Sequence, residues 1–120
     1  MERNEVKLLV CGGRDYSDKE YLTIYLNYIH KTCAITTLIH GDADGADKLA
    51  GEWAEERGIK VIAVPAEWDK YGKAAGYKRN VKMADMKPDV VIAFRGGRGT
   101  QMMKQIARDR KIRVVEAGYV

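Results

Sequence analysis

The sequence lacks a long apolar run and contains little proline or cysteine. Its 120 residues include 2 prolines and 2 cysteines. No stretch approaches the roughly 20 apolar residues that span a bilayer, and Met1-Glu2-Arg3-Asn4-Glu5 has no apolar core of an export signal. We therefore expect a cytoplasmic protein that does not insert into a membrane.

Cysteine and charge set further limits. Cys11 and Cys33 form no Cys-x-x-Cys pair, so we expect reduced thiols; we also expect neither a metal nor a cofactor. The formal net charge is a modest +4. The longest basic segment, Lys104–Arg113, alternates with Asp109 and apolar residues, which is typical of a solvated helix face rather than of a nucleic-acid-binding stripe. Nucleic acid is therefore not an expected partner.

Apolar runs and helical patterns alternate along the chain. The runs are continuous and rich in Val and Ile, which is typical of strands buried on both faces. They predict strands at Val6–Val10, Ile35–Ile39, Lys60–Val64, Asp89–Phe94 and Ile112–Val115. Helices are predicted from Ser17 onward and over Asp44–Arg57, Ala74–Met86 and Gly99–Arg110. The chain is predicted to form one α/β domain over residues 1–120, a Rossmann-like three-layer sandwich with a parallel five-stranded sheet of order 3-2-1-4-5.

The helices carry local signals of their ends and of assembly. Ser17, with a glutamate three residues later, resembles a capping box, and Asp44 is expected to cap the second helix. Tyr21, Tyr25 and Tyr28 recur at helical spacing and give the first helix more apolar surface than one sheet face needs. We expect a homodimer from this stripe, although core packing explains it almost as well.

The candidate site lies in the loops that follow the strands. Ligands of open parallel sheets bind beyond the carboxyl ends of the strands, and helix N-termini there favour anions. These loops are rich in glycine and polar residues. They contribute the ligand-binding candidates Gly12, Gly13, Arg14, His40, Gly41, Asp42, Gly45, Asp47, Arg95, Gly96, Gly97, Arg98, Gly99 and Thr100.

The strongest signal is the segment Arg95-Gly96-Gly97-Arg98-Gly99-Thr100, which follows an apolar run. Glycine permits positive φ and exposes backbone N–H groups, and arginine supplies charge for an anion. The segment therefore predicts a phosphate site. It is not a P-loop, and the chain has no Gly-x-Gly-x-x-Gly dinucleotide pattern.

Other candidates have competing interpretations. Asp42 and Asp47 either contact a ribose hydroxyl or serve helix capping, and His40 either faces the ligand or is structural. Calcium is not expected, because Trp53 occupies the twelfth position where an EF-hand requires glutamate. Gly12-Gly13 is explained equally by turn formation.

A second unusual segment runs from Gly72 to Asn80. Gly76, Arg79 and Asn80 are ligand candidates there, since arginine offers a planar pair of donors and asparagine can donate and accept. Trp68, just before it, either stacks on a base or packs in the core. The other tryptophan, at position 53, is assigned to the core.

Several motifs together resemble the YspA/YpsA-related members of the SLOG superfamily, which are common in bacteria and their phages. They are Cys11–Arg14, His40–Ala50, Pro65–Trp68, Gly76–Asn80 and Ala93–Thr100, and the resemblance covers nearly the whole chain. It implies a Rossmann-like fold that binds a nucleotide or a nucleotide-derived ligand.

The same superfamily includes LOG-type phosphoribohydrolases, which cleave the bond between a base and ribose 5′-monophosphate. Their pattern is similar to Arg79 followed by the glycine loop Gly96–Thr100. Gln101, Met102 and Met103 stand where the resemblance places the catalytic acid, so cleavage would need a substitute. Arg79, Asp42 and Asp47 are the catalytic candidates, and Glu67 is a further possible carboxylate.

Three functions follow from these observations. The first is binding of a nucleotide-derived small molecule, for sensing or sequestering, at the carboxyl edge of the sheet. The second is a LOG-like phosphoribohydrolase or another nucleotide-processing enzyme. The third is a nucleic-acid or protein adaptor built on the same fold. The glycine and arginine loops favour the first two functions, and the Met102-Met103 pair favours the first over the second.

Overall fold

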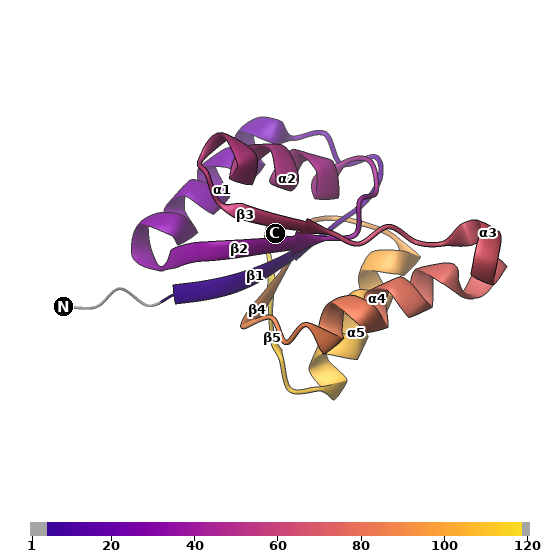
Figure 1. The fold of residues 1–120 in the computed structure, drawn as a ribbon. Helices are drawn as coiled ribbons and strands as arrows, with labels where there is room; N and C mark the ends of the chain where they lie inside the picture. Colours follow the sequence, from indigo (N-terminus) through magenta and orange to yellow (C-terminus); the bar gives the residue numbers. More distant parts are fainter. Residues whose placement is uncertain (1–4, 119–120) are drawn as a thin grey trace.

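The computed structural model describes residues 5–118 and contains a five-stranded sheet in the order β3-β2-β1-β4-β5 (Figure 1). All pairings between neighbouring strands are parallel, and the strands are β1 (Glu5–Cys11), β2 (Ala34–His40), β3 (Lys60–Ala63), β4 (Val90–Ala93) and β5 (Arg113–Glu116). The α/β class, the parallel sheet and its order, all predicted from the sequence, are confirmed.

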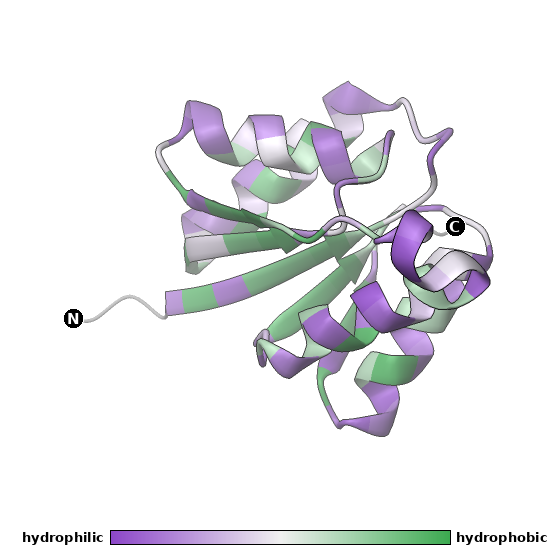
Figure 2. Cartoon of the chain, turned by 45° about the vertical axis from the view of Figure 1, so that its right-hand side comes forward, coloured by the Kyte–Doolittle hydropathy of each residue, from purple (hydrophilic) through white to green (hydrophobic). Residues whose placement is uncertain are grey.

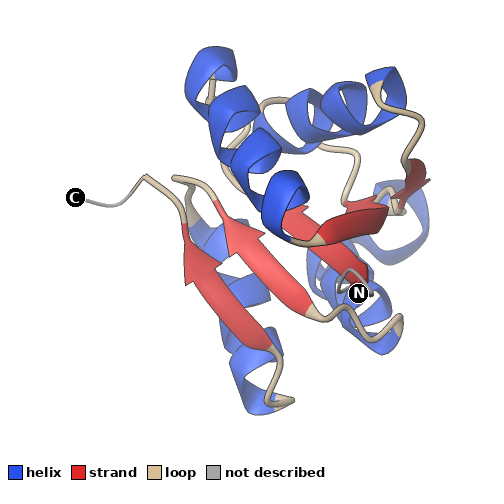
Figure 3. Cartoon of the chain, turned by 90° about the vertical axis from the view of Figure 1, so that its left-hand side faces the viewer, coloured by secondary structure: helices blue, strands red, loops and turns tan. Residues whose placement is uncertain are grey.

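Helices cover both faces of this sheet (Figure 3). They are α1 (Lys19–Thr32), α2 (Ala46–Glu56), a short α3 (Trp68–Tyr71), the 3₁₀ turn η1 (Gly72–Ala74), α4 (Ala75–Asp85) and α5 (Arg98–Asp109). The pair α1 and α2 lies on one face and the pair α4 and α5 on the other (Figure 1). The result is the three-layer sandwich expected of a Rossmann-like chain.

The core is divided between the two faces by alternation along the central strands. In β1, Leu8 and Val10 pack under α1 and α2, whereas Leu9 and Cys11 pack against α4 and α5. The strands are mostly apolar with a few polar positions, mainly near their ends, and the helices carry polar residues on their outer sides (Figure 2). Burial on both faces explains why the sequence runs are continuous rather than alternating.

The helix starts differ from the prediction by one residue. The side chain of Asp18, not Ser17, accepts a hydrogen bond from the Tyr21 backbone N at 3.0 Å and caps α1. For α2, the cap position falls on Gly45, and no side chain caps it. Asp44 is exposed and pairs with Lys48 one turn later. Both predictions of a capping side chain were therefore wrong in detail.

The predicted basic face at Lys104–Arg113 is not a uniformly solvated surface. Lys104 is buried at 3% exposure, and its Nζ lies 2.5 Å from Glu116 Oε1. Arg110 pairs with Asp85, and Arg108 lies 3.7 Å from the Glu116 carboxylate. Three of the basic side chains of this segment thus have acidic partners.

The tyrosines of α1 do not form a single stripe. Tyr21 and Tyr25 are partly buried and pack against the core, with their rings 5.9 Å apart. Tyr28 is 68% exposed, and so is most of Ile24, one turn earlier at 60%. Ile24 and Tyr28 are therefore the large apolar side chains of α1 that are mostly exposed.

Two simple properties follow from the described part of the chain. Cys11 and Cys33 form no disulfide within residues 5–118. No helix in that range is both long enough and apolar enough to cross a bilayer.

Phe94, directly after β4, is the largest fully buried side chain and provides a test of the core. Its ring lies 5.2 Å from the Tyr16 ring and 5.9 Å from the Tyr25 ring. We expect Phe94→Ala to lower the free energy of unfolding in urea by about 3–5 kcal/mol, because it leaves a cavity among these rings. The matched control Tyr77→Ala removes a 54% exposed aromatic ring and should change it by about 0.5 kcal/mol or less. A loss below about 1 kcal/mol for Phe94→Ala would contradict this packing.

Candidate functional site

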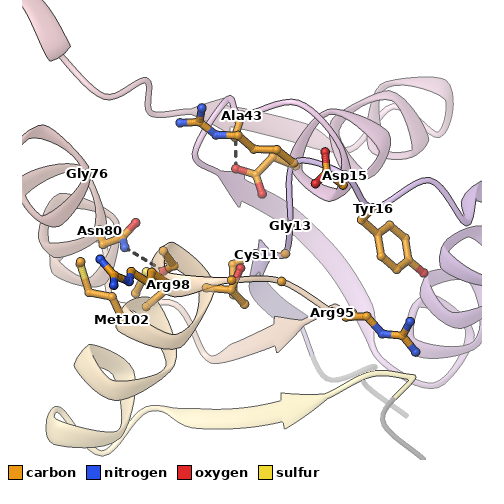
Figure 4. A pocket seen from close by; sticks show the side chains of 18 of the residues that line it. Cys11, Gly13, Asp15, Tyr16, Ala43, Gly76, Asn80, Arg95, Arg98 and Met102 are labelled. Atoms are coloured by element: carbon orange, nitrogen blue, oxygen red, sulfur yellow. Dashed lines mark hydrogen bonds between the residues drawn. The ribbon is translucent and has the colours of Figure 1, made fainter.

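The loops after β1 and β4 meet at the centre of the sheet, where the strand order reverses. Gly13 N donates to Arg95 O, and Phe94 N donates to Cys11 O, both at 2.8 Å. A cavity of about 1080 Å³ opens above this junction, between the loops and the start of α5 (Figure 4). This is the position at which open parallel sheets bind their ligands.

Most of the predicted site residues line this cavity. They are Gly12, Gly13, Arg14, Asp47, Trp68, Gly76, Arg79, Asn80, Arg95, Gly96, Gly97, Arg98, Gly99 and Thr100. Gly41 and Asp42 instead line a smaller neighbouring cavity of about 300 Å³, which shares Arg14, Ala43, Trp68 and Arg79 with the first. His40 and Gly45 line neither. That any of these residues contacts a ligand stays a prediction.

In the Arg95–Thr100 loop, only Gly96 is required for close approach of the backbone, and no glycine is required for a positive φ. None of them has a φ in the left-handed region. A Cβ on Gly96 would lie 2.2 Å from Thr100 Oγ1 and 2.6 Å from Gly13 N, so this position admits no side chain. A Cβ on Gly97 or Gly99 would meet no protein atom within 4 Å. The backbone at Gly97 and Gly99 is therefore open to the cavity.

This open backbone leads into α5, whose first turn begins at Arg98 with Gly97 as its uncapped N-terminal residue. No side chain occupies the N–H groups there, and the helix dipole adds positive potential. Arg95 and Arg98 are exposed, and neither forms an ion pair within residues 5–118. Backbone donors and two available guanidinium groups thus face one space.

Asp47, in the first turn of α2, is a buried carboxylate in the cavity wall. Its Oδ2 accepts hydrogen bonds from Gly41 N at 2.9 Å and from Ala43 N at 3.3 Å. Burial raises the pKa of Asp47 to about 6, while these bonds and the nearby Arg79 pull it down. The predicted helix-capping role is replaced by one in which Asp47 holds the loop after β2.

Arg79 joins three elements at the same wall. Its Nη1 donates to Gly41 O at 2.5 Å, and its Nε donates to Asn80 Oδ1 at 2.9 Å. Asn80 Nδ2 in turn donates to Gly99 O at 3.3 Å. Burial lowers the pKa of Arg79, and Asp47 counteracts this. Two of the three guanidinium nitrogens are therefore engaged, and Arg79 supports the wall before any ligand contact.

Gly41 is required for this arrangement. A Cβ there would lie 2.5 Å from Arg79 Nη1 and 3.0 Å from Asp47 Oδ2. The sequence identified Gly41 as a ligand contact, but its place in the structure is explained by the two charged side chains that pack against it.

His40, at the end of β2, is structural. It is 5% exposed, its Nδ1 accepts from Asp42 N at 2.9 Å, and its ring lies against Gly51. Burial lowers its pKa, which favours the neutral form that can accept this bond. Of the two interpretations of His40, the structural one agrees with its burial.

Trp68 does not belong to the core. It is 49% exposed at the cavity mouth, and the Arg14 guanidinium carbon lies 5.9 Å from its ring centroid. The core interpretation of Trp68 was therefore wrong. Trp53, in contrast, is 3% exposed and packs in the core as predicted, with its indole Nε1 donating to Asn27 at 2.9 Å.

Other lining residues were missed by the sequence analysis, notably Tyr16, Lys73 and Tyr77. The Tyr16 hydroxyl is buried and has no hydrogen-bond partner within residues 5–118. Tyr16 lies only two residues beyond Arg14 in the same loop. Lys73 and Tyr77 lie inside the segment from Gly72 to Asn80, but neither was named as a ligand candidate. Cys11 also lines the cavity, but burial raises its pKa to about 12, and its thiol stays protonated near neutral pH.

Asp47 gives a pH-dependent prediction. Its pKa is about 6 in the folded chain against an ordinary 3.8, so the folded state binds its proton more tightly and stability falls as pH rises through this window. We expect the free energy of unfolding of the wild type, minus that of Asp47→Asn, to fall by about 2–3 kcal/mol between pH 4 and pH 7. Asp44→Asn is the matched control, because Asp44 is exposed. Parallel stability profiles for wild type and Asp47→Asn would contradict the raised pKa.

Known proteins resemble the chain in sequence and in fold. The "Gene 61 protein" of Mycobacterium phage D29 is 32% identical over 120 residues, covering 93% of this chain and 96% of the phage protein. The X-ray structure of DNA processing protein A (DprA) from Streptococcus pneumoniae superposes with a TM-score of 0.75 at 20% identity. That alignment covers 96% of this chain but only 51% of the DprA chain, and it shows a shared fold.

A family assignment rests on the first half of the chain and the loops described above. The sequence profile of YAcAr, the YspA, cpYpsA-related SLOG family, matches residues 6–71, which include the loops after β1 and β2. The chain therefore belongs to the YspA, cpYpsA-related SLOG family.

Proposed function

We propose that the chain binds a nucleotide or a nucleotide-derived small molecule in the 1080 Å³ cavity and acts by sensing or sequestering it. The observation that carries this proposal is the open, uncapped start of α5. There the exposed backbone of Gly97 and Gly99 and the side chains of Arg95 and Arg98 face one cavity. Such a combination of N–H groups, helix dipole and arginine charge suits a phosphate.

The remaining wall suits the other parts of a nucleotide. Trp68 and Tyr77 are exposed aromatic side chains at the cavity mouth and offer faces for a base. The Asp47 carboxylate is an acceptor for a ribose hydroxyl on the opposite side of the glycine loop. The volume lies at the upper end of ordinary ligand sites, about 300–1,000 Å³. A ligand with a phosphate, a sugar and a base satisfies all three regions.

A phosphoribohydrolase is the second candidate, and Asp47 is the observation that favours it. A buried carboxylate with a raised pKa, in a cavity wall beside an arginine, has the properties of a catalytic acid or base. The positions that match the catalytic acid of the LOG pattern contribute no carboxylate, because methionine occupies positions 102 and 103. Met103 is also buried, at 1% exposure. Base release by this chain would therefore depend on Asp47.

We also propose that the chain is cytoplasmic and forms a homodimer. The apolar surface available for a dimer contact on α1 is smaller than its tyrosine pattern suggested. Its mostly exposed large apolar side chains are Ile24 and Tyr28. A two-fold contact would place these side chains against their copies on a second chain.

Binding is tested with paired glycine variants and an arginine variant. Gly97→Val adds a side chain where no protein atom lies within 4 Å, so it should fold normally but block an anion at the start of α5. Arg98→Ala should weaken binding about ten- to a hundredfold, since charge-assisted contacts contribute roughly 1.5–3 kcal/mol. Calorimetry with nucleoside monophosphates and diphosphates measures both effects. Circular dichroism and the melting temperature report the fold.

Gly96→Ala is the control for the loop itself. Its Cβ would clash with Thr100 and Gly13, so it should lower the melting temperature as well as the affinity. Equal nucleotide affinity in wild type, Gly97→Val and Arg98→Ala would show that the phosphate site is misplaced. Release of free base from nucleoside monophosphates by the wild type, lost in Asp47→Asn, would replace the binding function with the hydrolase.

Assembly is tested by light scattering at high micromolar concentration. We expect a dimer for the wild type and a monomer for Tyr28→Glu, because a charge at this exposed position opposes an apolar contact. A monomeric wild type would remove the dimer proposal and would leave the ligand proposal standing.

A further inference from the structure

One of the two most basic segments of the chain lies beside the cavity. Residues 68–82 contain Lys70, Lys73, Lys78, Arg79 and Lys82 against the single acid Asp69, a net charge of +4. This equals the formal net charge of the whole chain. The four lysines are exposed, and none forms an ion pair with a side chain of residues 5–118. A merely solvated helix face would carry interleaved charges of both signs.

Aromatic side chains lie among these lysines. Trp68 is 49% exposed and Tyr77 is 54% exposed, which is unusual for rings of this size. Tyr71 lies between two cations, with Lys70 Nζ 5.1 Å and Lys78 Nζ 4.8 Å from its ring centroid.

The position of the Trp68 ring is fixed by α4. Its Cη2 lies 3.5 Å from the place where a Cβ on Gly76 would stand, so the ring rests on the helix at its glycine. The indole therefore presents its surface at the molecular exterior without belonging to either core cluster.

The surface formed by α3, η1 and the first two turns of α4 extends beyond the cavity. Trp68, Lys73 and Tyr77 line the cavity, whereas Lys70, Lys78 and Lys82 do not. In Figure 1, α3 and the start of α4 form one end of the molecule, so this surface is accessible to a long partner. A single nucleotide in the cavity would leave these three lysines without a ligand contact.

We propose that this surface binds single-stranded nucleic acid that passes the mouth of the cavity. Lysines spaced along a surface attract successive phosphates, and exposed aromatic rings stack on unpaired bases; the two together are the usual features of single-strand binding. A duplex hides its base faces and would leave the rings unused. DNA and RNA share this chemistry. The other basic segment, Lys104–Arg113, differs because Lys104, Arg108 and Arg110 lie against Glu116 or Asp85.

The test uses fluorescence anisotropy with labelled oligothymidylate and oligouridylate of about 20 nucleotides, enough for more than one typical binding site. We expect the wild type to bind and Lys70→Gln/Lys78→Gln/Lys82→Gln to bind at least tenfold more weakly. The slope of log affinity against log salt should fall in magnitude by about 2, because three phosphate contacts at roughly 0.7 each are removed. Trp68→Ala should weaken binding about ten- to a hundredfold. Comparing the two oligomers shows whether DNA or RNA is preferred.

The matched control is Lys31→Gln/Lys60→Gln/Arg113→Gln. These residues are exposed, and their replacement changes the net charge equally. Lys60 and Arg113 begin β3 and β5, and Lys31 lies in the last turn of α1, just before β2. The control should keep its affinity within about threefold. An equal loss in the control, equal binding of a duplex, or no binding by the wild type at low salt would overturn the proposal.

Mononucleotide calorimetry on the same triple variant separates this proposal from the cavity function. The three lysines do not line the cavity, so mononucleotide affinity should be unchanged. If oligonucleotides bind and mononucleotides do not, the proposal for this surface stands and the proposal of a nucleotide ligand in the cavity is wrong. The reverse result would retain the cavity ligand and reject this surface.

Discussion

Close contact between the backbones that follow β1 and β4 determines the shape of the candidate site. Gly13 N bonds to Arg95 O at 2.8 Å, and Gly96 lies so near Gly13 and Thr100 that no side chain fits. The contact brings two loops, distant in sequence, into one cavity floor and directs the start of α5 toward it. Gly96, part of the glycine segment that predicted a phosphate site, is thus required for the packing of the two loops at the point where the strand order reverses.

Charge in the cavity is distributed between a buried and an exposed set. Asp47 is held in the wall by backbone donors, and Arg79 beside it is engaged with the Gly41 carbonyl. A guanidinium that already stabilises a loop and a buried carboxylate is less available to an incoming anion. Arg95 and Arg98 are exposed and line the cavity, so the phosphate recognition that we propose would fall mainly to them.

The sheet could be predicted from the sequence because burial on both faces of a parallel strand imposes continuous apolar runs. Side-chain partners could not be predicted, because they depend on contacts between distant segments. Lys104 appears in the sequence as part of a basic helix face, yet it is buried against Glu116 of the neighbouring strand. Trp68 is a residue type that often packs in the core. Here it begins α3 and its ring lies against Gly76 of α4, which leaves the side chain 49% exposed. The sequence predicted where the loops of the cavity lie. The contacts of His40, Gly41 and Arg79 could be assigned only from the structure, because they join segments that are apart in the sequence.

The absence of a carboxylate in the first turns of α5 has a structural consequence for any reaction in this cavity. Met103 belongs to the core cluster beneath the sheet, so an acid at that position would be buried among apolar side chains at a large cost. Met102 is only partly buried, and an acid there would reach the cavity wall without entering the core. Asp15, Asp18 and Asp47 line the cavity, and the buried one of these carboxylates, Asp47, comes from α2 on the other face of the sheet. Any cleavage would thus approach the sugar from the side of Asp47, and the geometry of the LOG pattern would not transfer.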